Sequence, residues 1–310
     1  MLRPMLAVTG NPFDSPHFLY EIKWDGYRCL AYLEESTSLR SRNLQDFTPS
    51  FPELQSLHRR VKKKPALLDG EIIAYRDGSI SFDALQERGR LTDPVKIKRA
   101  AERNPVLYVV FDLLFLAGES LLQKPLKTRK ELLASAVESG GSLVISEFVL
   151  AEGKKFFAAA RERLLEGVMA KHVESRYLPG KRSPLWQKFL NLKETELFIC
   201  GYEEGRGSRL IGSLLLADYS GGRFFYRGKV GTGFGRKEEE ILLKALKPLE
   251  VGAPSERFPE VKSHSRLHWV KPELVCTVAY HTLTDKGLLR HPHYIKIRQD
   301  QIFKCNKDNP

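Results

Sequence analysis

The stretch Leu19-Tyr20-Glu21-Ile22-Lys23-Trp24-Asp25-Gly26-Tyr27-Arg28 places one lysine inside a strand-like apolar run and follows it with an Asp-Gly pair. The large apolar residues before Asp25 have the bulk and shape of side chains in a partly buried strand. Asp25-Gly26 is typical of a turn, and residues 27–32 have the composition of a second strand. We therefore expect a hairpin, with Lys23 near its end and facing a cleft.

A lysine at such a position has two interpretations. It can be a strand lysine whose ammonium group simply extends to solvent. It can also be a nucleophile, provided that desolvation, neighbouring cations or a metal favour the neutral amine. The short pattern around Lys23 does not decide between them, so the rest of the chain has to be considered.

The residues Lys23, Asp25, Gly26 and Arg28 form the pattern K-x-D-G-x-R. This pattern resembles motif I of the covalent nucleotidyltransferases, a superfamily of ATP-dependent DNA ligases, RNA ligases and mRNA capping enzymes. The resemblance implies that Lys23 attacks the α-phosphorus of a nucleotide and carries the nucleoside monophosphate as a phosphoramidate.

Three later segments resemble further motifs of this superfamily, in the same order along the chain. Asp69-Gly70-Glu71 resembles motif III, whose glutamate binds the ribose, and a carboxylate in an apolar strand needs a polar partner. Phe111 lies in a strand-prone run and has the position of the purine-stacking aromatic residue of motif IIIa. The segment from Glu166 to Lys171 resembles motif IV, whose glutamate helps to hold a divalent metal.

Two arginines are candidate contacts for DNA phosphates. Ser41-Arg42-Asn43 resembles motif Ia of DNA ligases, whose arginine meets a phosphate of the nicked strand. Arg182 lies in a basic turn, residues 177–183, and is a candidate contact for the 5′-phosphate of the nick.

Motifs V and VI match with departures. Motif V is usually W-x-K-x-K, and Lys188 matches its first lysine whereas Leu190 occupies the second lysine position. Motif VI is usually R-x-D-K, matched by Arg298 and Asp300, with Gln301 in place of the lysine. These departures put in doubt one cationic contact to the α-phosphate and one charge that orients pyrophosphate.

We expect an α+β protein of two domains, a nucleotidyltransferase (adenylation) domain of antiparallel sheets flanked by helices, residues 1–195, and an OB-fold barrel, residues 196–310. Amphipathic patterns predict helices over 127–137 and 156–165 in the first domain. After residue 196, short strands punctuated by glycine, with one helix over 237–246, fit an OB-type barrel. The strands that we predict there are 213–219, 223–230 and 274–280.

Composition limits the classes of function. The chain has 310 residues, 42% of them hydrophobic, and a net charge of +12, as expected for a protein that binds a polyanion. No apolar run of about 18 residues is present, so we expect no membrane association and a cytoplasmic location in the bacterial cytosol or nucleoid. The cysteines Cys29, Cys200, Cys276 and Cys305 lack zinc-ligand spacing, so we expect them to be reduced.

The resemblance covers about residues 4–301 and implies an ATP-dependent DNA ligase that joins a 3′-hydroxyl to a 5′-phosphate in nicked double-stranded DNA. Lys23 would take AMP from ATP, pass it to the 5′-phosphate, and the 3′-hydroxyl would then displace it, with Mg²⁺ or alternatively Mn²⁺ as the metal. The implied roles are adenine contacts for Glu21, Ile22 and Phe111, ribose contacts for Glu71 and Arg28, α-phosphate contacts for Lys171 and Lys188, β- and γ-phosphate contacts for Arg298 and Asp300, and the metal site for Glu166 and Asp25.

The likeness is greatest to ligase D-type end-joining enzymes and their minimal ligase C-type relatives. It implies a monomer that works with a Ku-like end-binding protein and a repair polymerase or nuclease. Because motif I begins within about twenty residues of the start, we expect the grip on DNA to be weak or to be supplied by a partner. Two alternatives stay open: an RNA ligase or capping-type enzyme, and a catalytically weak DNA-binding module, which Leu190 and Gln301 would suit.

Overall fold

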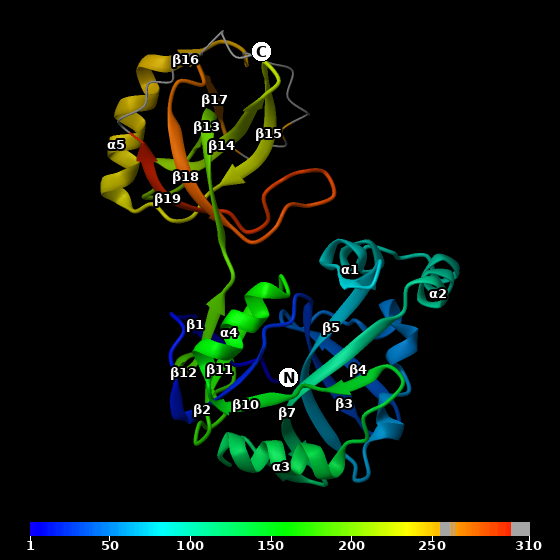
Figure 1. The fold of residues 1–310 in the computed structure, drawn as a ribbon. Coiled ribbons are helices and arrows are strands. Elements are labelled where there is room, and N and C mark those ends of the chain that lie inside the picture. The colour runs from blue at the N-terminus through cyan, green and yellow to red at the C-terminus, as the bar shows by residue number, and fades with distance from the viewer. Residues whose placement is uncertain (255–260, 262, 264, 299–310) are drawn as a thin grey trace. The chain divides into compact units, whose positions relative to one another are not determined.

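The structure is a computed structural model that describes residues 1–254, 261, 263 and 265–298. The chain divides into two compact units, Met1–Asn191 and Leu192–Pro310. Each unit has its own sheets and its own buried apolar core (Figure 1). We describe each unit by itself.

The first unit contains a five-stranded sheet whose central strands carry several of the predicted site residues. Its order is β1 (Leu6–Thr9), β12 (Arg182–Leu190), β11 (Gly167–His172), β2 (Ser15–Ile22) and β10 (Phe148–Ala151). β11 runs antiparallel to both β12 and β2, and Met169 lies opposite Lys188 on one side and Glu21 on the other. Residues about 150 positions apart in the sequence thus become neighbours across three strands.

A seven-stranded sheet completes the first unit. Its main order is β4 (Thr37–Ser41), β3 (Tyr27–Leu33), β5 (Ala66–Arg76), β7 (Val106–Leu116) and β8 (Glu119–Ser120), while β6 (Ser79–Ile80) pairs with β5 and β9 (Leu143–Ile145) with β7. Arg28 on β3 lies directly opposite Glu71 on β5. The long central strands β5 and β7 are almost continuously buried, as their apolar sequences predict.

The predicted hairpin around Asp25-Gly26 is wrong, because β2 and β3 belong to different sheets. β2 already pairs with β10 and β11, and β3 with β4 and β5, so neither strand has a free edge for the other. The segment between them crosses from one sheet to the next. A Cβ atom on Gly26 would lie 2.1 Å from the carbonyl oxygen of Ile72, so only glycine fits this close passage. Lys23 therefore lies where the two sheets meet.

Four helices complete the first unit (Figure 1). They are α1 (Phe82–Gly89), α2 (Pro94–Arg103), α3 (Leu126–Ala136) and α4 (Gly153–Glu162), with short 3₁₀ turns at Thr48–Ser50, Pro52–Leu54 and Leu57–Arg60. α3 packs on β7, and α4 packs on β11 and β2. The helix predicted over 127–137 is confirmed almost to the residue, and the helix predicted over 156–165 begins and ends three residues earlier.

The second unit is a curved sheet built around one long strand. β13 (Lys193–Glu204) pairs with β14 (Ile211–Ser220) on one side and with both β17 (Leu267–Val270) and β18 (Val275–Tyr280) on the other. β15 (Arg223–Val230), β16 (Glu250–Val251) and β19 (His293–Arg298) extend it, and α5 (Arg236–Leu246) runs into the 3₁₀ turn Lys247–Leu249. The strands and the helix predicted here are confirmed with shifts of a few residues at their ends.

Two expectations from composition concern membranes and cysteines. None of the helices in the described part of the chain is long and apolar enough to cross a membrane. Cys29, Cys200 and Cys276 are free and buried, and burial raises the pKa of the Cys200 and Cys276 thiols to about 12. Cys305, Asp300 and Gln301 lie outside the described residues.

Candidate active site

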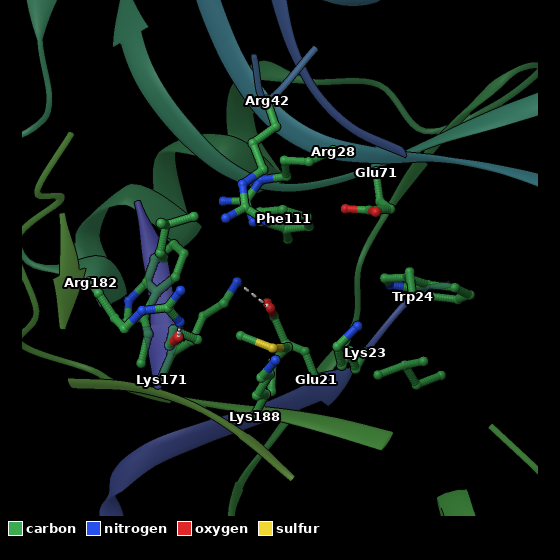
Figure 2. A pocket seen from close by; sticks show the side chains of 15 residues that line it. Glu21, Lys23, Trp24, Arg28, Arg42, Glu71, Phe111, Lys171, Arg182 and Lys188 are labelled. Carbon is green, nitrogen blue, oxygen red and sulfur yellow. Dashed lines mark hydrogen bonds and ion pairs between the residues drawn. The ribbon is translucent and has the colours of Figure 1, made fainter. Parts of the chain in front are cut away.

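A pocket of about 230 Å³ opens between the two sheets of the first unit (Figure 2). Most of the predicted site residues line it, although they come from positions between 21 and 188. The lining residues are Leu6, Ala7, Glu21, Ile22, Lys23, Trp24, Arg28, Arg42, Glu71, Phe111, Met169, Lys171, Arg182, Trp186 and Lys188. Cations dominate this lining, so the pocket suits an anionic ligand.

Lys23 meets a carboxylate where the two sheets join. Its Nζ lies 2.5 Å from an oxygen of Glu166, the residue just before β11, and both side chains are largely buried. Burial raises the pKa of Glu166, the charge of Lys23 opposes this shift, and the charge of Asp25 adds to it. The amine that the motif singles out is therefore in the pocket and held by one ion pair.

Arg28 is held in place from behind by Asp69. Its Nε and one terminal nitrogen donate to the two carboxylate oxygens of Asp69 at 2.5 and 2.6 Å. Asp69 is fully buried and also accepts a hydrogen bond of 2.6 Å from the Tyr177 hydroxyl. The Arg28 guanidinium then lies over the Phe111 ring, 4.6 Å from its centroid. Sequence reasoning named Arg28 and Phe111 as site residues, and it quoted Asp69 within motif III but gave it no role.

Glu71, two residues after Asp69, has a different environment. It points into the pocket and makes no hydrogen bond or ion pair to any described residue. Desolvation raises its pKa to about 8, and the charges of Arg28 and Lys23 only partly offset this shift. The polar partner expected for this carboxylate is not supplied by the described protein groups, so the side chain is available to a ligand.

Glu21 lies between two lysines in the floor of the pocket. One carboxylate oxygen accepts from Lys171 at 2.6 Å, and the other forms an ion pair with Lys130 of α3. The Lys171 ammonium also lies between two rings, 4.2 Å from the centroid of Phe111 and 4.5 Å from that of Trp186. Desolvation lowers the pKa of Lys171 to about 8, against the opposing charge of Glu21. Lys130 was not predicted, because nothing local in the sequence links α3 to β2.

Three further cations line the pocket: Lys188, Arg42 and Arg182. Desolvation lowers the pKa of Lys188, and the nearby charge of Lys23 lowers it further. Arg42 and Arg182 are exposed, and the Arg182 guanidinium donates to the carbonyl of Ala7. These arginines are thus accessible to a large anionic ligand.

Some predicted site residues are not part of the pocket lining. Glu166 and Asp25, both predicted for the metal site, are not among the lining residues. Glu166 pairs with Lys23, and Asp25 acts on Glu166 through its charge. Arg298 belongs to the second unit, where it forms an ion pair with Glu196. In residues 1–254, 261, 263 and 265–298 there is no group of three or more His, Cys, Asp or Glu side chains that could hold a metal ion.

Comparison with known proteins agrees with this geometry. The family model of the ATP dependent DNA ligase domain matches residues 4–189, and that of the ATP dependent DNA ligase C terminal region matches residues 207–301. The chain belongs to the ATP-dependent DNA ligase family. The resemblance inferred from the motifs is confirmed, and so is the fold class of this ligase-family chain, an α+β nucleotidyltransferase domain followed by an OB-type region.

The similarity to individual relatives covers nearly the whole chain. The chain is 33% identical over 307 residues to the multifunctional non-homologous end joining DNA repair protein LigD of Mycobacterium tuberculosis, covering 97% of this chain and 39% of that protein. It is 31% identical over 291 residues to DNA ligase C1 of Mycolicibacterium smegmatis, covering 90% and 83%. The solved structure of mycobacterial DNA ligase D complexed with ATP and MES matches with a TM-score of 0.57 at 32% identity, covering 97% and 96%.

Proposed function

We propose that this chain is an ATP-dependent DNA ligase that seals nicks between a 3′-hydroxyl and a 5′-phosphate through a lysyl-AMP intermediate on Lys23. The observation that carries the proposal is the placement of the Lys23 amine in a pocket rich in cations, beside Glu166. The membership of the chain in the ATP-dependent DNA ligase family supports the same reaction. The chain spans about two fifths of the length of the LigD relatives that it matches.

Three displacements at phosphorus make up the reaction. The Lys23 nitrogen forms a bond to the α-phosphorus of ATP and loses a proton, while the bond to pyrophosphate breaks. The 5′-phosphate oxygen of the nick then takes the adenylyl group and releases the lysine. Finally the 3′-hydroxyl oxygen bonds to the activated 5′-phosphorus and releases its proton to solvent, while the phosphoanhydride bond breaks and AMP leaves with the electron pair.

The pocket residues have complementary tasks in this scheme. Phe111 and Ile22 would hold the purine, and Glu71, whose carboxyl group has no protein partner in the described chain, would accept from a ribose hydroxyl. Lys188 and Lys171 would neutralise charge on the α-phosphate, because a preorganised cation in a desolvated site acts strongly on such charge. Arg42 and Arg182 would bind phosphates of the nicked strand.

A divalent metal would be held next to Lys23, by the carboxylate of Glu166. Mg²⁺ is usually bound by one or two carboxylates together with water and phosphate oxygens, rather than by an all-protein cage. Glu166, with a carboxyl pKa raised by burial and with Asp25 nearby, is a carboxylate of this kind. Mg²⁺ or Mn²⁺ held there would shield charge at the reacting phosphate.

The wider setting follows from the relatives. We infer a role in DNA repair by end joining, with a Ku-like end-binding protein and a repair polymerase as partners, and a location in the bacterial cytosol. The two compact units support the expected division into an adenylation domain, residues 1–195, and an OB domain, residues 196–310. Arg298 and Asp300 of the second domain would then bind the β- and γ-phosphates.

Replacing Lys23 by alanine tests the proposal directly. With ATP labelled at the α-phosphate, the wild-type chain should acquire a covalent label, whereas Lys23→Ala should show label only at background level, because it lacks the proposed nucleophile. Denaturing electrophoresis measures the adduct. Lys98→Ala, on an exposed position of α2, is the control and should label like the wild type.

The nucleotide used for labelling and the nucleic-acid substrate that is sealed distinguish a DNA ligase from an RNA ligase or a capping enzyme. A DNA ligase labels with ATP rather than GTP and seals nicked DNA in preference to nicked RNA or triphosphate-ended RNA. Labelling of Lys23→Ala at the wild-type level contradicts the role of Lys23. Tight binding to nicked DNA without any adduct would instead indicate a non-catalytic DNA-binding module.

A further inference from the structure

Lys130 is buried and charged, yet it is not among the residues that line the pocket. It extends from α3 to the carboxylate of Glu21 and lies under the ring of Phe148, 5.4 Å from its centroid. Its neighbour Arg129 is also fully buried and binds Asp112, the residue after Phe111, through two hydrogen bonds of 2.8 Å. Consecutive residues of α3 thus anchor one strand from each of the two sheets that form the pocket.

Two lysines share the single carboxylate of Glu21. Lys171 lines the pocket and pairs with one oxygen of the carboxylate, whereas Lys130 is not among the lining residues and pairs with the other oxygen. One cation would be enough to neutralise Glu21, so the second ion pair needs an explanation. Leaving a buried carboxylate without any partner is strongly unfavourable. With Lys130 in place, the departure of Lys171 leaves Glu21 still paired.

From this arrangement we propose that Lys130 is a positioning residue that serves as the permanent counter-ion of Glu21, so that Lys171 can release Glu21 and bind the phosphate of the nucleotide. This inference rests on the proposed function, because it assigns Lys171 to the nucleotide phosphate. Lys130 itself touches neither the nucleotide nor the reacting atoms. It acts by lowering the free-energy cost of moving Lys171.

The position of Lys171 agrees with a side chain that changes partner. Its ammonium group lies between the Phe111 and Trp186 rings. A cation is attracted to an aromatic ring at distances of up to about 6 Å, so a small movement of the ammonium group keeps this attraction. Figure 2 shows this ammonium among the side chains that line the pocket, with Glu21 as its drawn partner. A short rotation of the lysine chain would direct it away from Glu21.

Lys130→Met tests this inference. Without Lys130, Lys171 becomes the sole counter-ion of Glu21, so we expect the single-turnover rate constant of adduct formation at saturating ATP to fall at least about tenfold, the effect of losing one charge-assisted contact. Lys127→Met is the matched control: it is an exposed lysine on the same helix, paired with Glu174, and should keep the wild-type rate. If Lys130→Met does not fold, Lys130→Gln, which keeps a donor toward Glu21, takes its place.

A double-mutant cycle separates positioning from general damage to the fold. In a Glu21→Gln background there is no carboxylate to neutralise, so adding Lys130→Met should change the rate constant by less than about twofold. The same fall in both backgrounds, or no fall in the wild-type background, overturns the inference.

Failure of the proposed function would look different. In that case the wild-type chain itself would form no adduct. Failure of the inference alone leaves the wild-type adduct intact, with Lys130→Met labelling as fast as the wild type.

Discussion

Asp69 and Glu71 lie two residues apart on β5 and have opposite surroundings. Asp69 is fully buried and is satisfied by Arg28 and Tyr177. Glu71 faces the pocket without a hydrogen-bond partner in the described chain, and desolvation raises its pKa to about 8. Sites of ligand binding commonly retain such unsatisfied groups, because the ligand supplies the missing partner.

The raised pKa of Glu71 gives a pH prediction. At pH values between 4.5, the ordinary pKa of a glutamate, and about 8, the Glu71 carboxyl group is protonated in the folded protein and ionised in the unfolded chain. The contribution of Glu71 to the free energy of unfolding therefore falls as pH rises through this window. Glu71→Gln should remove this part of the dependence of the free energy of unfolding on pH, which corresponds to the release of up to one proton on unfolding between about pH 5 and pH 8.

Urea unfolding across that pH range, without nucleotide or metal, measures the effect. Glu147→Gln, at an exposed carboxylate, is the control and should keep the wild-type slope. An identical pH dependence in Glu71→Gln and the wild type would show that Glu71 is not desolvated.

The element that decides the site is the connection between β2 and β3. It carries Lys23 from one sheet to the other, and at Gly26 it passes so close to β5 that a side chain would meet the backbone of Ile72. A Cβ atom there would also lie 2.9 Å from Cγ of Glu71. The geometry of this crossing thus sets the positions of the nucleophile and of the neighbouring carboxylate together.

Gly26→Ala should therefore damage both stability and chemistry. The added methyl group forces the crossing away from β5, so we expect a loss of about 1–3 kcal/mol in the free energy of unfolding. Formation of the covalent adduct should fall by at least about tenfold, because a small displacement of a nucleophile is costly. Calorimetry and adduct labelling measure the two effects.

Gly252→Ala is the matched control, since a Cβ at that glycine has open space around it. It should leave both quantities near their wild-type values. If the two variants had the same stability and the same rate of adduct formation, the connection between β2 and β3 would accommodate a methyl group at position 26 without loss.

On the scale of the whole molecule, the net charge of +12 favours binding to a polyanion such as DNA. Within the first unit, Arg42 and Arg182 are exposed and line the same pocket as Lys23. A nicked strand that reached Lys23 would bring its phosphates to these arginines.

Arg182→Gln should weaken binding to a nick that carries a 5′-phosphate and lower the salt dependence of that binding. Each lost phosphate contact reduces the slope of log K against log salt by about one. Binding titrations at several salt concentrations measure this slope.

A nick with a 5′-hydroxyl is the matched substrate, and the effect of Arg182→Gln should be smaller there. An equal effect on both substrates would mean that Arg182 does not contact the 5′-phosphate.

Local patterns in the sequence predicted most of the elements. The apolar run that contains Phe111 is a core strand, and the helix over 127–137 and the short strands after residue 211 are where their periodicities indicate. The Asp25-Gly26 pair was misinterpreted as a hairpin turn. A turn signal describes the chain locally and carries no information about which strand edges are still free.

The sequence by itself determined the family and predicted Lys23 as the nucleophile, because motifs of a few residues carry this information. Only the tertiary structure decided how the charges are shared. The pairing of Lys130 and Lys171 with Glu21, and of Asp69 with Arg28, joins residues between 41 and 150 positions apart. Such pairs depend on how sheets and helices pack. Packing is a property of the whole folded chain, so it cannot be predicted from a short segment of the sequence.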